Sequence, residues 1–141
     1  MNQMKGFTLI ELVLVIAILG ILAVAAIPTF LTGSLNSARV ASMNATVGAI
    51  QTGIAIFAAT NMASYGTVSY PATLDSASNG AATPANRHFT SILQNGVSSQ
   101  WIKGSATSYT FDMNADSTVT TGTDTCCTYT VATGLFTCAT C

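Results

Sequence analysis

Charged side chains are scarce in this sequence. Of its 141 residues, four are Lys or Arg and five are Asp or Glu, so 6% are charged. Ordinary soluble domains have roughly 25%, and the mean hydropathy here is positive, so we do not expect a freely soluble globule. The few basic residues form no patch that could neutralise several phosphates, which argues against dedicated nucleic-acid recognition. The length allows one modest domain and an anchoring element.

The sequence also has little that suggests catalysis. The only histidine, His88, has no carboxylate near it in the sequence, so we expect a solvated loop residue. Asp112, Asp116 and Asp124 lack the Asp and Gly spacing and the closing Glu of a known calcium loop, which favours ordinary turn aspartates. We therefore expect no enzyme activity, cofactor or bound metal. Trp101 and the tyrosines are expected in the core or at its rim.

What the sequence does have is one long apolar run. Leu12 to Ile27 is sixteen residues without a polar side chain. With its apolar flanks the segment reaches about 25 residues, which exceeds the roughly 30 Å of a bilayer's hydrocarbon core. A cleaved secretory signal is the alternative, but its apolar core would be shorter and would end at a small-residue site. Lys5 before the run places the N-terminus in the cytoplasm and the rest outside.

One carboxylate, Glu11, stands at the start of this apolar run. A carboxylate at membrane depth costs about 2.5 to 3.5 kcal/mol even on lenient scales, so we expect it to have a partner. The residues themselves leave two interpretations open. Glu11 pairs with a cation, or it lies in the first helical turn, where it favours the helix dipole and reaches the lipid headgroups.

The helix is expected to continue beyond the apolar run, from Phe7 to about Thr60. Apolar residues recur there at spacings of three and four, which keeps them on one face that needs a sheet or a helix to cover it. They are Val40, Met43, Val47, Ile50, Ile54 and Phe57. Gly20 and Pro28 are weak points because both residue types destabilise a helix interior. We expect a kink or local unwinding between them.

The remainder is predicted to form loops and short strands. Residues 58–88 are rich in loop-forming residues, and the spacing of Phe89, Ile92 and Leu93 before Gly96 predicts a two-turn helix. Five candidate strands follow, with short connections that favour antiparallel hairpins. They are Gln100 to Lys103, Ser108 to Met113, Ser117 to Thr121, Cys126 to Val131 and Leu135 to Cys138. The predicted fold class is therefore α+β, with an antiparallel sheet on the amphipathic helix.

Four cysteines lie in the last part of the chain, namely Cys126, Cys127, Cys138 and Cys141. Outside the cytoplasm we expect them to be oxidised in one of three pairings, of which a Cys126–Cys127 bridge is disfavoured by ring strain. A two-residue turn at 133–134 would place Cys126 opposite Cys141, and Cys127 on the same face as Cys138. These nested pairs are therefore favoured over the crossed pairs. A four-thiolate zinc site or a redox-active Cys138–Cys141 pair is the alternative.

The stretch GFTLIELVLVIAILGILAVAAIP resembles the N-terminal segment of type IV pilins and of their relatives, the pseudopilins of type II secretion. Lys5 and Gly6 end the leader, Phe7 follows, and Glu11 stands at the fifth mature position. The resemblance implies that a prepilin peptidase cuts after Gly6 and N-methylates Phe7. It also implies that Glu11 pairs with the Phe7 amine of a neighbouring subunit during filament assembly.

The resemblance implies further features of the chain. Pro28 matches the family's proline, and Gly20 matches the glycine that starts the region unwound in assembled filaments. The implied pilin fold has a long N-terminal helix packed on a small antiparallel sheet. Its parts are a leader at 1–6, a transmembrane and filament-core helix at 7–31, an amphipathic helix half at 32–60, and a globular head with a disulfide-bonded C-terminal region at 61–141.

The implied function is that of a major pilin, which polymerises with itself into an extracellular type IV pilus for adhesion, motility or DNA uptake. Its expected partners are the prepilin peptidase, the inner-membrane assembly machinery with its ATPase, and the membrane before assembly, with no specific nucleic acid. A type II secretion pseudopilin or a minor pilin is the alternative within the family. A membrane-anchored extracytoplasmic thiol-redox or metal-binding protein is the alternative from a different class.

Overall fold

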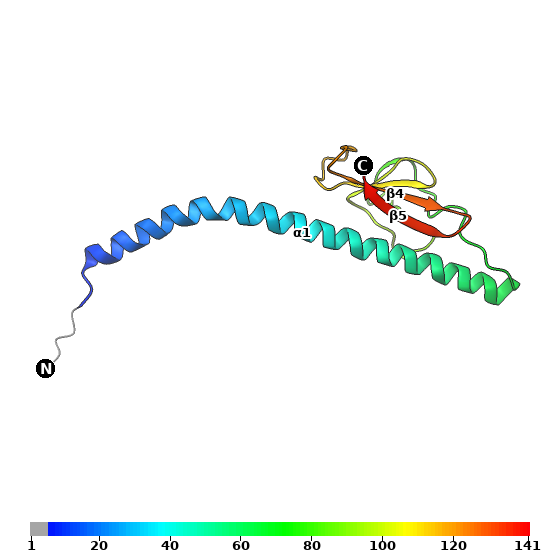
Figure 1. The fold of residues 1–141 in the computed structure, drawn as a ribbon, viewed down its shortest axis with the longest axis horizontal. Helices are drawn as coiled ribbons and strands as arrows, with labels where there is room; N and C mark the ends of the chain where they lie inside the picture. Colours follow the sequence, from blue (N-terminus) through cyan, green and yellow to red (C-terminus); the bar gives the residue numbers. More distant parts are fainter. Residues whose placement is uncertain (1–5) are drawn as a thin grey trace. The chain divides into compact units, whose positions relative to one another are not determined.

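A computed structural model describes residues 6–141, without the side chains of residues 28–32. The N-terminal residues 1–5, which hold Lys5 and most of the predicted leader, lie outside the described residues. One long helix, α1 (Leu9–Tyr65), precedes a small antiparallel sheet (Figure 1). The α+β prediction is therefore confirmed. The chain divides into two units, the residues up to Ala38 and the head unit, Arg39–Cys141, and each is described by itself.

Neither Gly20 nor Pro28 breaks α1. Every residue between them is helical, so the local unwinding expected there is absent from this part of the described chain. Unwinding would free backbone N–H and C=O groups, and a single exposed helix offers no new partner for them. Proline removes one helical hydrogen bond and crowds the carbonyl four residues before it, and here the helix continues through that local cost. The unwinding that the family resemblance implies for an assembled filament stays a prediction.

The helix ends at Tyr65, beyond the expected end near Thr60, and a glycine terminates it. Gly66 has a positive φ of 72°, and its N–H donates to the carbonyl of Met62 at 3.0 Å. This left-handed cap satisfies one of the last helical carbonyls, and glycine adopts it without a steric penalty.

Five strands form one sheet within the described residues, in the order β1-β2-β3-β4-β5 with every neighbouring pair antiparallel. Their bounds are Gly80–Ala81 for β1, Trp101–Lys103 for β2, Ser108–Phe111 for β3, Thr125–Thr130 for β4 and Leu135–Thr140 for β5. The chain order equals the spatial order, so the sheet is a simple meander. Sequence analysis missed β1, because two residues carry no detectable alternation.

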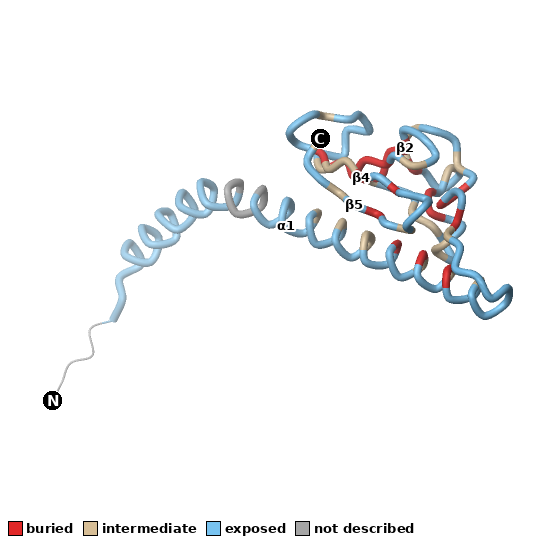
Figure 2. Tube along the Cα trace, turned by 45° about the vertical axis from the view of Figure 1, so that its right-hand side comes forward, coloured by how far each residue is buried: buried red, intermediate tan, exposed pale blue. Residues whose placement is uncertain are grey.

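The core of the head unit lies between the sheet and the second half of α1. Ile50 and Ile54 are buried there. Figure 2 shows buried positions in red both on this half of α1 and in the strand region. The predicted apolar stripe is thus confirmed at its centre, whereas Val40 at its start is 38% exposed. Phe89 packs edge-on against Trp101 with ring centroids 5.2 Å apart. Such aromatic pairs contribute about 0.5–1.5 kcal/mol beyond their buried area.

The strand predicted at Ser117 to Thr121 is wrong, because this segment belongs to the loop between β3 and β4. Two buried aspartates hold the loop by accepting its backbone N–H groups. Asp112 accepts from Ala115 at 2.6 Å and from Ser117 at 2.7 Å, and Asp124 accepts from Thr120 at 2.7 Å. Carboxylates thus take the donors that a neighbouring strand would otherwise bind.

The two-turn helix predicted from Phe89 is also wrong. Phe89 has a φ of 61°, outside the right-handed helical region, and the segment contains a single turn with Leu93 N–H donating to the Phe89 carbonyl at 2.9 Å. The backbone groups of His88 and Val97 bond to each other at 3.0 and 2.9 Å. This pair closes the segment into a loop, so the tertiary fold overrides the local helical spacing.

Candidate functional site

The residues around the predicted cleavage position are open to solvent. Gly6 and Phe7 precede the first turn of α1 and lie outside regular structure. Phe7 is 90% exposed, and a side-chain carbon placed on Gly6 would meet no atom within 4 Å. The Gly6–Phe7 peptide bond therefore lies in an accessible segment outside regular structure, where a peptidase can reach it.

Glu11 and Thr8 form a capping box at the start of α1. The Glu11 carboxylate oxygen Oε2 accepts from the Thr8 backbone N–H at 3.0 Å and from the Thr8 hydroxyl at 2.8 Å. The Glu11 N–H donates to the Thr8 hydroxyl oxygen at 3.4 Å. This reciprocal arrangement satisfies donors that the first helical turn leaves without partners. Sequence analysis missed it, although a Thr followed three residues later by a Glu is its sequence signal.

The capping box occupies only one oxygen of the carboxylate. Both bonds from Thr8 end on Oε2, and Oε1 accepts no hydrogen bond from the described residues. A carboxylate has about four acceptor positions. Glu11 is therefore oriented by its own helix while Oε1 stays available to a donor or a cation from outside.

The helix surface that follows Glu11 is apolar and wholly exposed. The stretch Leu9–Ile27 is long and apolar enough to cross a membrane, and none of it is buried. At 1.5 Å per residue its 19 residues span about 29 Å, close to the thickness of the hydrocarbon core. Gly33–Tyr65 passes the same test but is less apolar, and it supplies Ile50 and Ile54 to the core. An exposed apolar surface of this length needs lipid or other helices to cover it.

The cysteines form two disulfides in the head unit. Cys126 is bonded to Cys141 and Cys127 to Cys138, which are the nested pairs that sequence analysis favoured. Cys127 points into the core with 1% of its surface exposed. Its neighbour Cys126 points to the other face, where its sulfur lies 3.7 Å from the Thr110 hydroxyl. The two bridges therefore join β4 to the C-terminal segment on opposite faces of the sheet.

The turn assumed in deriving that pairing was wrong. Residues 131–134 connect β4 to β5, so Cys127 lies directly opposite Cys138 and Cys126 lies opposite Ala139. The observed register differs from the assumed one by two residues. Because side chains alternate with a period of two, such a shift leaves every residue on its original face. The favoured pairing survives for this reason.

A buried polar cluster in the head unit was not predicted. The Asp75 carboxylate accepts from the Lys103 ammonium at 2.5 Å, the Phe89 N–H at 2.8 Å and the Tyr109 hydroxyl at 3.0 Å. Asp75 is 2% exposed and Lys103 is 6% exposed. Burial raises the pKa of Asp75, but these three donors outweigh it and hold the pKa below its ordinary value. Burial and the Asp75 charge raise the pKa of Tyr109, so its hydroxyl stays a donor.

His88 lies beside this cluster, and the prediction that it is solvated is wrong. Its exposed fraction is 0%, and neither ring nitrogen has a hydrogen-bond partner among the described residues. The ring packs 6.1 Å from that of Tyr109 and 6.3 Å from that of Phe89, measured between centroids. Burial lowers the pKa of His88, an effect that Asp75 opposes and Lys103 reinforces. The uncharged ring therefore serves as a packing residue.

The three aspartates that were expected in turns differ in solvent exposure. Asp112 and Asp124 are buried, whereas Asp116 is exposed at the tip of the β3–β4 loop. Within the described residues, no three His, Cys, Asp or Glu side chains are grouped in a way that could hold a metal ion. Asp112 and Asp124 instead hold the loop backbone, since each accepts at least two backbone N–H groups.

Comparison with known protein families identifies the N-terminal segment. The family described as the prokaryotic N-terminal methylation motif matches residues 1–27. This motif is the prepilin signature of type IV pilin-like proteins, and it contains Gly6, Phe7, Glu11 and the apolar run. No solved structure matches the chain. The motif points to a structural protein that is anchored in the membrane through its apolar helix before assembly.

Proposed function

We propose that this chain is a major pilin, the repeating structural subunit of an extracellular type IV pilus. The observation that carries the proposal is the exposed apolar helix Leu9–Ile27, which lies within the match to the methylation motif. A helix of this kind fits lipid before assembly and the apolar centre of a helical bundle afterwards. The head unit, with its own core and two disulfides, would form the outer surface of the filament.

Leader removal would take away Lys5 and leave the amine of Phe7 as the only cationic group close to Glu11 in the sequence. Cleavage after Gly6 by the prepilin peptidase frees the amine of Phe7, and N-methylation leaves that amine able to carry a proton. We propose that it bonds to Glu11 of a neighbouring subunit, for which the unoccupied Oε1 is suitably free. Pairing would offset the cost of a carboxylate at membrane depth and would draw the subunit from the bilayer into register.

The proposal includes a route through the cell. The chain would wait in the inner membrane, lose residues 1–6 to the peptidase, and be polymerised by the inner-membrane assembly machinery and its ATPase. The lipid-facing segment 7–31 would then become the filament core, with Gly20 and Pro28 bounding a stretch that unwinds there. Adhesion, motility or DNA uptake are the activities that such a surface filament would support.

Substitution of Glu11 tests the proposal. In cells that carry the prepilin peptidase and assembly machinery, Glu11→Ala should be inserted and cleaved normally but should form no filaments in electron micrographs. Because this variant also loses the capping box, Glu11→Gln is the matched control. Its amide oxygen can accept both bonds from Thr8 but carries no charge. Failure of both variants supports charge pairing, whereas normal filaments from Glu11→Gln would refute it.

The alternatives predict different outcomes in the same cells. A pseudopilin or minor pilin would be cleaved and methylated at Phe7 yet would not account for the mass of a surface filament. Immunogold labelling of the head unit along whole filaments therefore supports the major-pilin assignment, and sparse or absent labelling contradicts it. A membrane-anchored redox or zinc protein would keep an intact N-terminus when exposed to prepilin peptidase.

A further inference from the structure

Charge is almost absent from the surface of the head unit. In Arg39–Cys141, all of which the structure describes, there are three cations and four carboxylates. Five of these seven groups are buried or half-buried, namely Asp75, Lys103, Asp112, Asp124 and Arg39. The exposed cation is Arg87 and the exposed anion is Asp116. The only ion pair among the described residues is Asp75–Lys103, so Arg87 and Asp116 do not pair within one chain.

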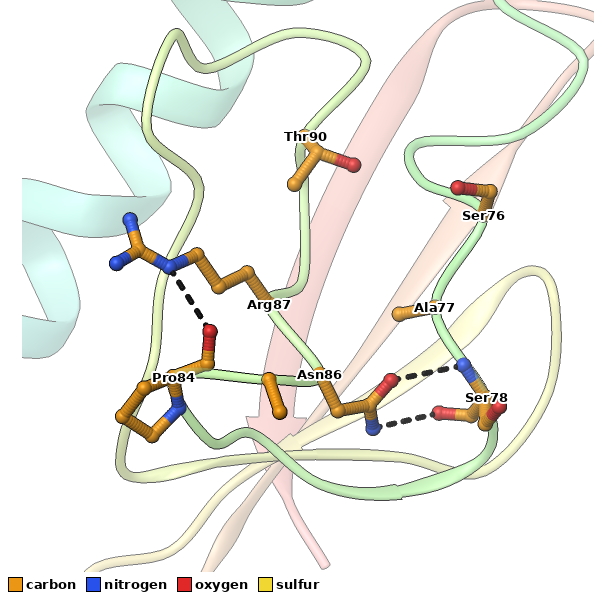
Figure 3. A pocket seen from close by; sticks show the side chains of 8 residues that line it. Ser76, Ala77, Ser78, Pro84, Asn86, Arg87 and Thr90 are labelled. Carbon is orange, nitrogen blue, oxygen red and sulfur yellow. Dashed lines mark hydrogen bonds between the residues drawn. The ribbon is translucent and has the colours of Figure 1, made fainter.

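Arg87 borders a depression of about 410 Å³ in the loops that flank β1. Figure 3 shows its two walls, residues 76–78 on one side and the segment from Pro84 to Thr90 on the other. The Asn86 side chain joins the walls by accepting from the Ser78 N–H at 2.9 Å and donating to the Ser78 carbonyl at 3.1 Å. The volume lies within the roughly 300–1,000 Å³ range of small-ligand sites, so the depression has room for a side chain from outside.

The depression offers donors and positive charge. Arg87 donates through Nε to the Pro84 carbonyl and through Nη1 to the Asn95 carbonyl, which fixes the guanidinium while Nη2 stays without a partner among the described residues. The hydroxyls of Ser76 and Thr90 on the walls likewise have no hydrogen bond within the described chain. No carboxylate lines the depression. Its complement is therefore an anionic group rich in acceptors.

Asp116 is presented as such a group. Ala115 and Ser117 on either side of it have φ values of 61° and 64°, which form a sharp loop tip. The Asp116 carboxylate accepts from the Thr118 hydroxyl at 2.6 Å, the Thr118 N–H at 2.8 Å and the Asn114 amide at 2.7 Å. These bonds, those from Thr118 first, lower the pKa of Asp116 and keep it ionised. Three bonds leave acceptor capacity on a carboxylate that is already oriented.

We propose that the Arg87 depression receives the Asp116 loop of a second copy of this chain. The proposal rests on the filament function proposed above, and charge complementarity selects the occupant. Arg87 lies in the segment after the edge strand β1, and Asp116 lies in the loop between β3 and β4. A contact between two different surfaces of identical chains is heterologous, and it repeats from subunit to subunit into an open helical filament. The contact would add a second point of register, between neighbouring head units, to the one that the Glu11–Phe7 pair sets between the helices.

Charge-reversal variants, alone and combined so that the two charges exchange places, test this contact in cells that assemble the filament. Arg87→Glu and Asp116→Lys should each lower filament yield about tenfold, because each places like charges at every contact along the filament. The double variant restores opposite charges in exchanged positions and should recover most of the yield. Near-ultraviolet circular dichroism of the detergent-solubilised chains checks that all variants fold. A neutral double variant, Arg87→Gln with Asp116→Asn, should assemble weakly and lose the salt sensitivity of wild-type filaments.

The possible results separate this contact from the filament function itself. Wild-type yields from both single variants would overturn the contact and leave the filament function standing. A folded double variant that assembles no better than the single variants would also overturn it, because a local defect in either loop cannot be rescued by the other. A cleaved wild-type chain that forms no filaments would overturn the proposed function, and this contact with it.

Discussion

Removing the Lys103 ammonium should strongly destabilise the head unit. Lys103→Met keeps the aliphatic stem in β2 but leaves the Asp75 carboxylate, 2% exposed, without its cation. The lost bond to the Ala77 carbonyl, 2.8 Å in the wild-type chain, adds to the effect. Removing one partner of a buried ion pair costs about 3–5 kcal/mol. This is a large fraction of the roughly 5–15 kcal/mol that stabilises a typical domain.

The cost has a definite dependence on pH. In the wild-type chain the folded pKa of Asp75 lies below its unfolded value of roughly 3.9, so its contribution is present above that value and is lost as pH falls through the folded pKa. In Lys103→Met the ammonium group that does most to lower the pKa of Asp75 is absent. Burial then raises the folded pKa of Asp75. The variant then loses stability as pH rises. The difference in unfolding free energy between the two chains should therefore widen from about pH 4 to pH 7.

Urea unfolding of the full chain in mild detergent measures this difference. Trp101 is the single tryptophan and is 2% exposed, so its fluorescence reports the loss of the core. The matched control is the double variant Asp75→Asn with Lys103→Met, which removes both charges and should recover much of the lost stability. A cost of less than about 1 kcal/mol for Lys103→Met at neutral pH, the range of an exposed ion pair, would refute this prediction. A double variant no more stable than the single one would refute it equally.

Two further predictions concern the same core. His88→Phe should reduce the loss of stability between about pH 7 and pH 5, because the folded pKa of His88 lies below its unfolded value of roughly 6.5 and the wild-type unfolded state gains a proton there; an unchanged pH dependence of the urea midpoint would contradict this. Replacing both cysteines of one bridge by alanine should cost about 3 kcal/mol for loops of this size. Removing the Cys127–Cys138 bridge should cost more stability than removing Cys126–Cys141, since Cys127 is buried and its loss leaves a cavity. Urea unfolding without reductant measures both costs, and the opposite order would rule this out.

The elements that could be predicted are those in which the hydrophobic pattern is repeated. Ile50 and Ile54 were assigned to the core face from helical spacing, and both are buried. The segment Ser108 to Met113 was predicted as a strand, and its Tyr109 and Phe111 both lie in the core cluster. Each assignment uses neighbours a few residues apart, so a local pattern is sufficient. The fold class follows from the same patterns, because a long apolar helix face and several short alternating segments must cover each other.

The features that could not be predicted depend on partners far apart in the sequence. Asp75 and Lys103 are 28 residues apart, and only the fold brings them together. His88 is buried beside Tyr109 in a loop that its backbone bonds to Val97 close, and these contacts have no local sequence signal. In the segment at Ser117 to Thr121, β-forming residues suggested a strand, but buried aspartates took up its backbone donors first. Local propensity fails in each case because a long-range polar contact decides the conformation.

Glu11 shows how a missed local contact changes the energetics of the proposed assembly. If Glu11 were a bare carboxylate in lipid, pairing with the amine of a neighbouring subunit would offset the whole free-energy cost of its desolvation. The structure gives it two donors from Thr8 first, so part of that cost is already offset before assembly. The driving force left for pairing is correspondingly smaller. A helix that orients Oε2 internally and leaves Oε1 free can stay in the membrane as a monomer and still bind a neighbour. Under the proposed function, the amine freed at Phe7 therefore adds to the capping box without having to break it.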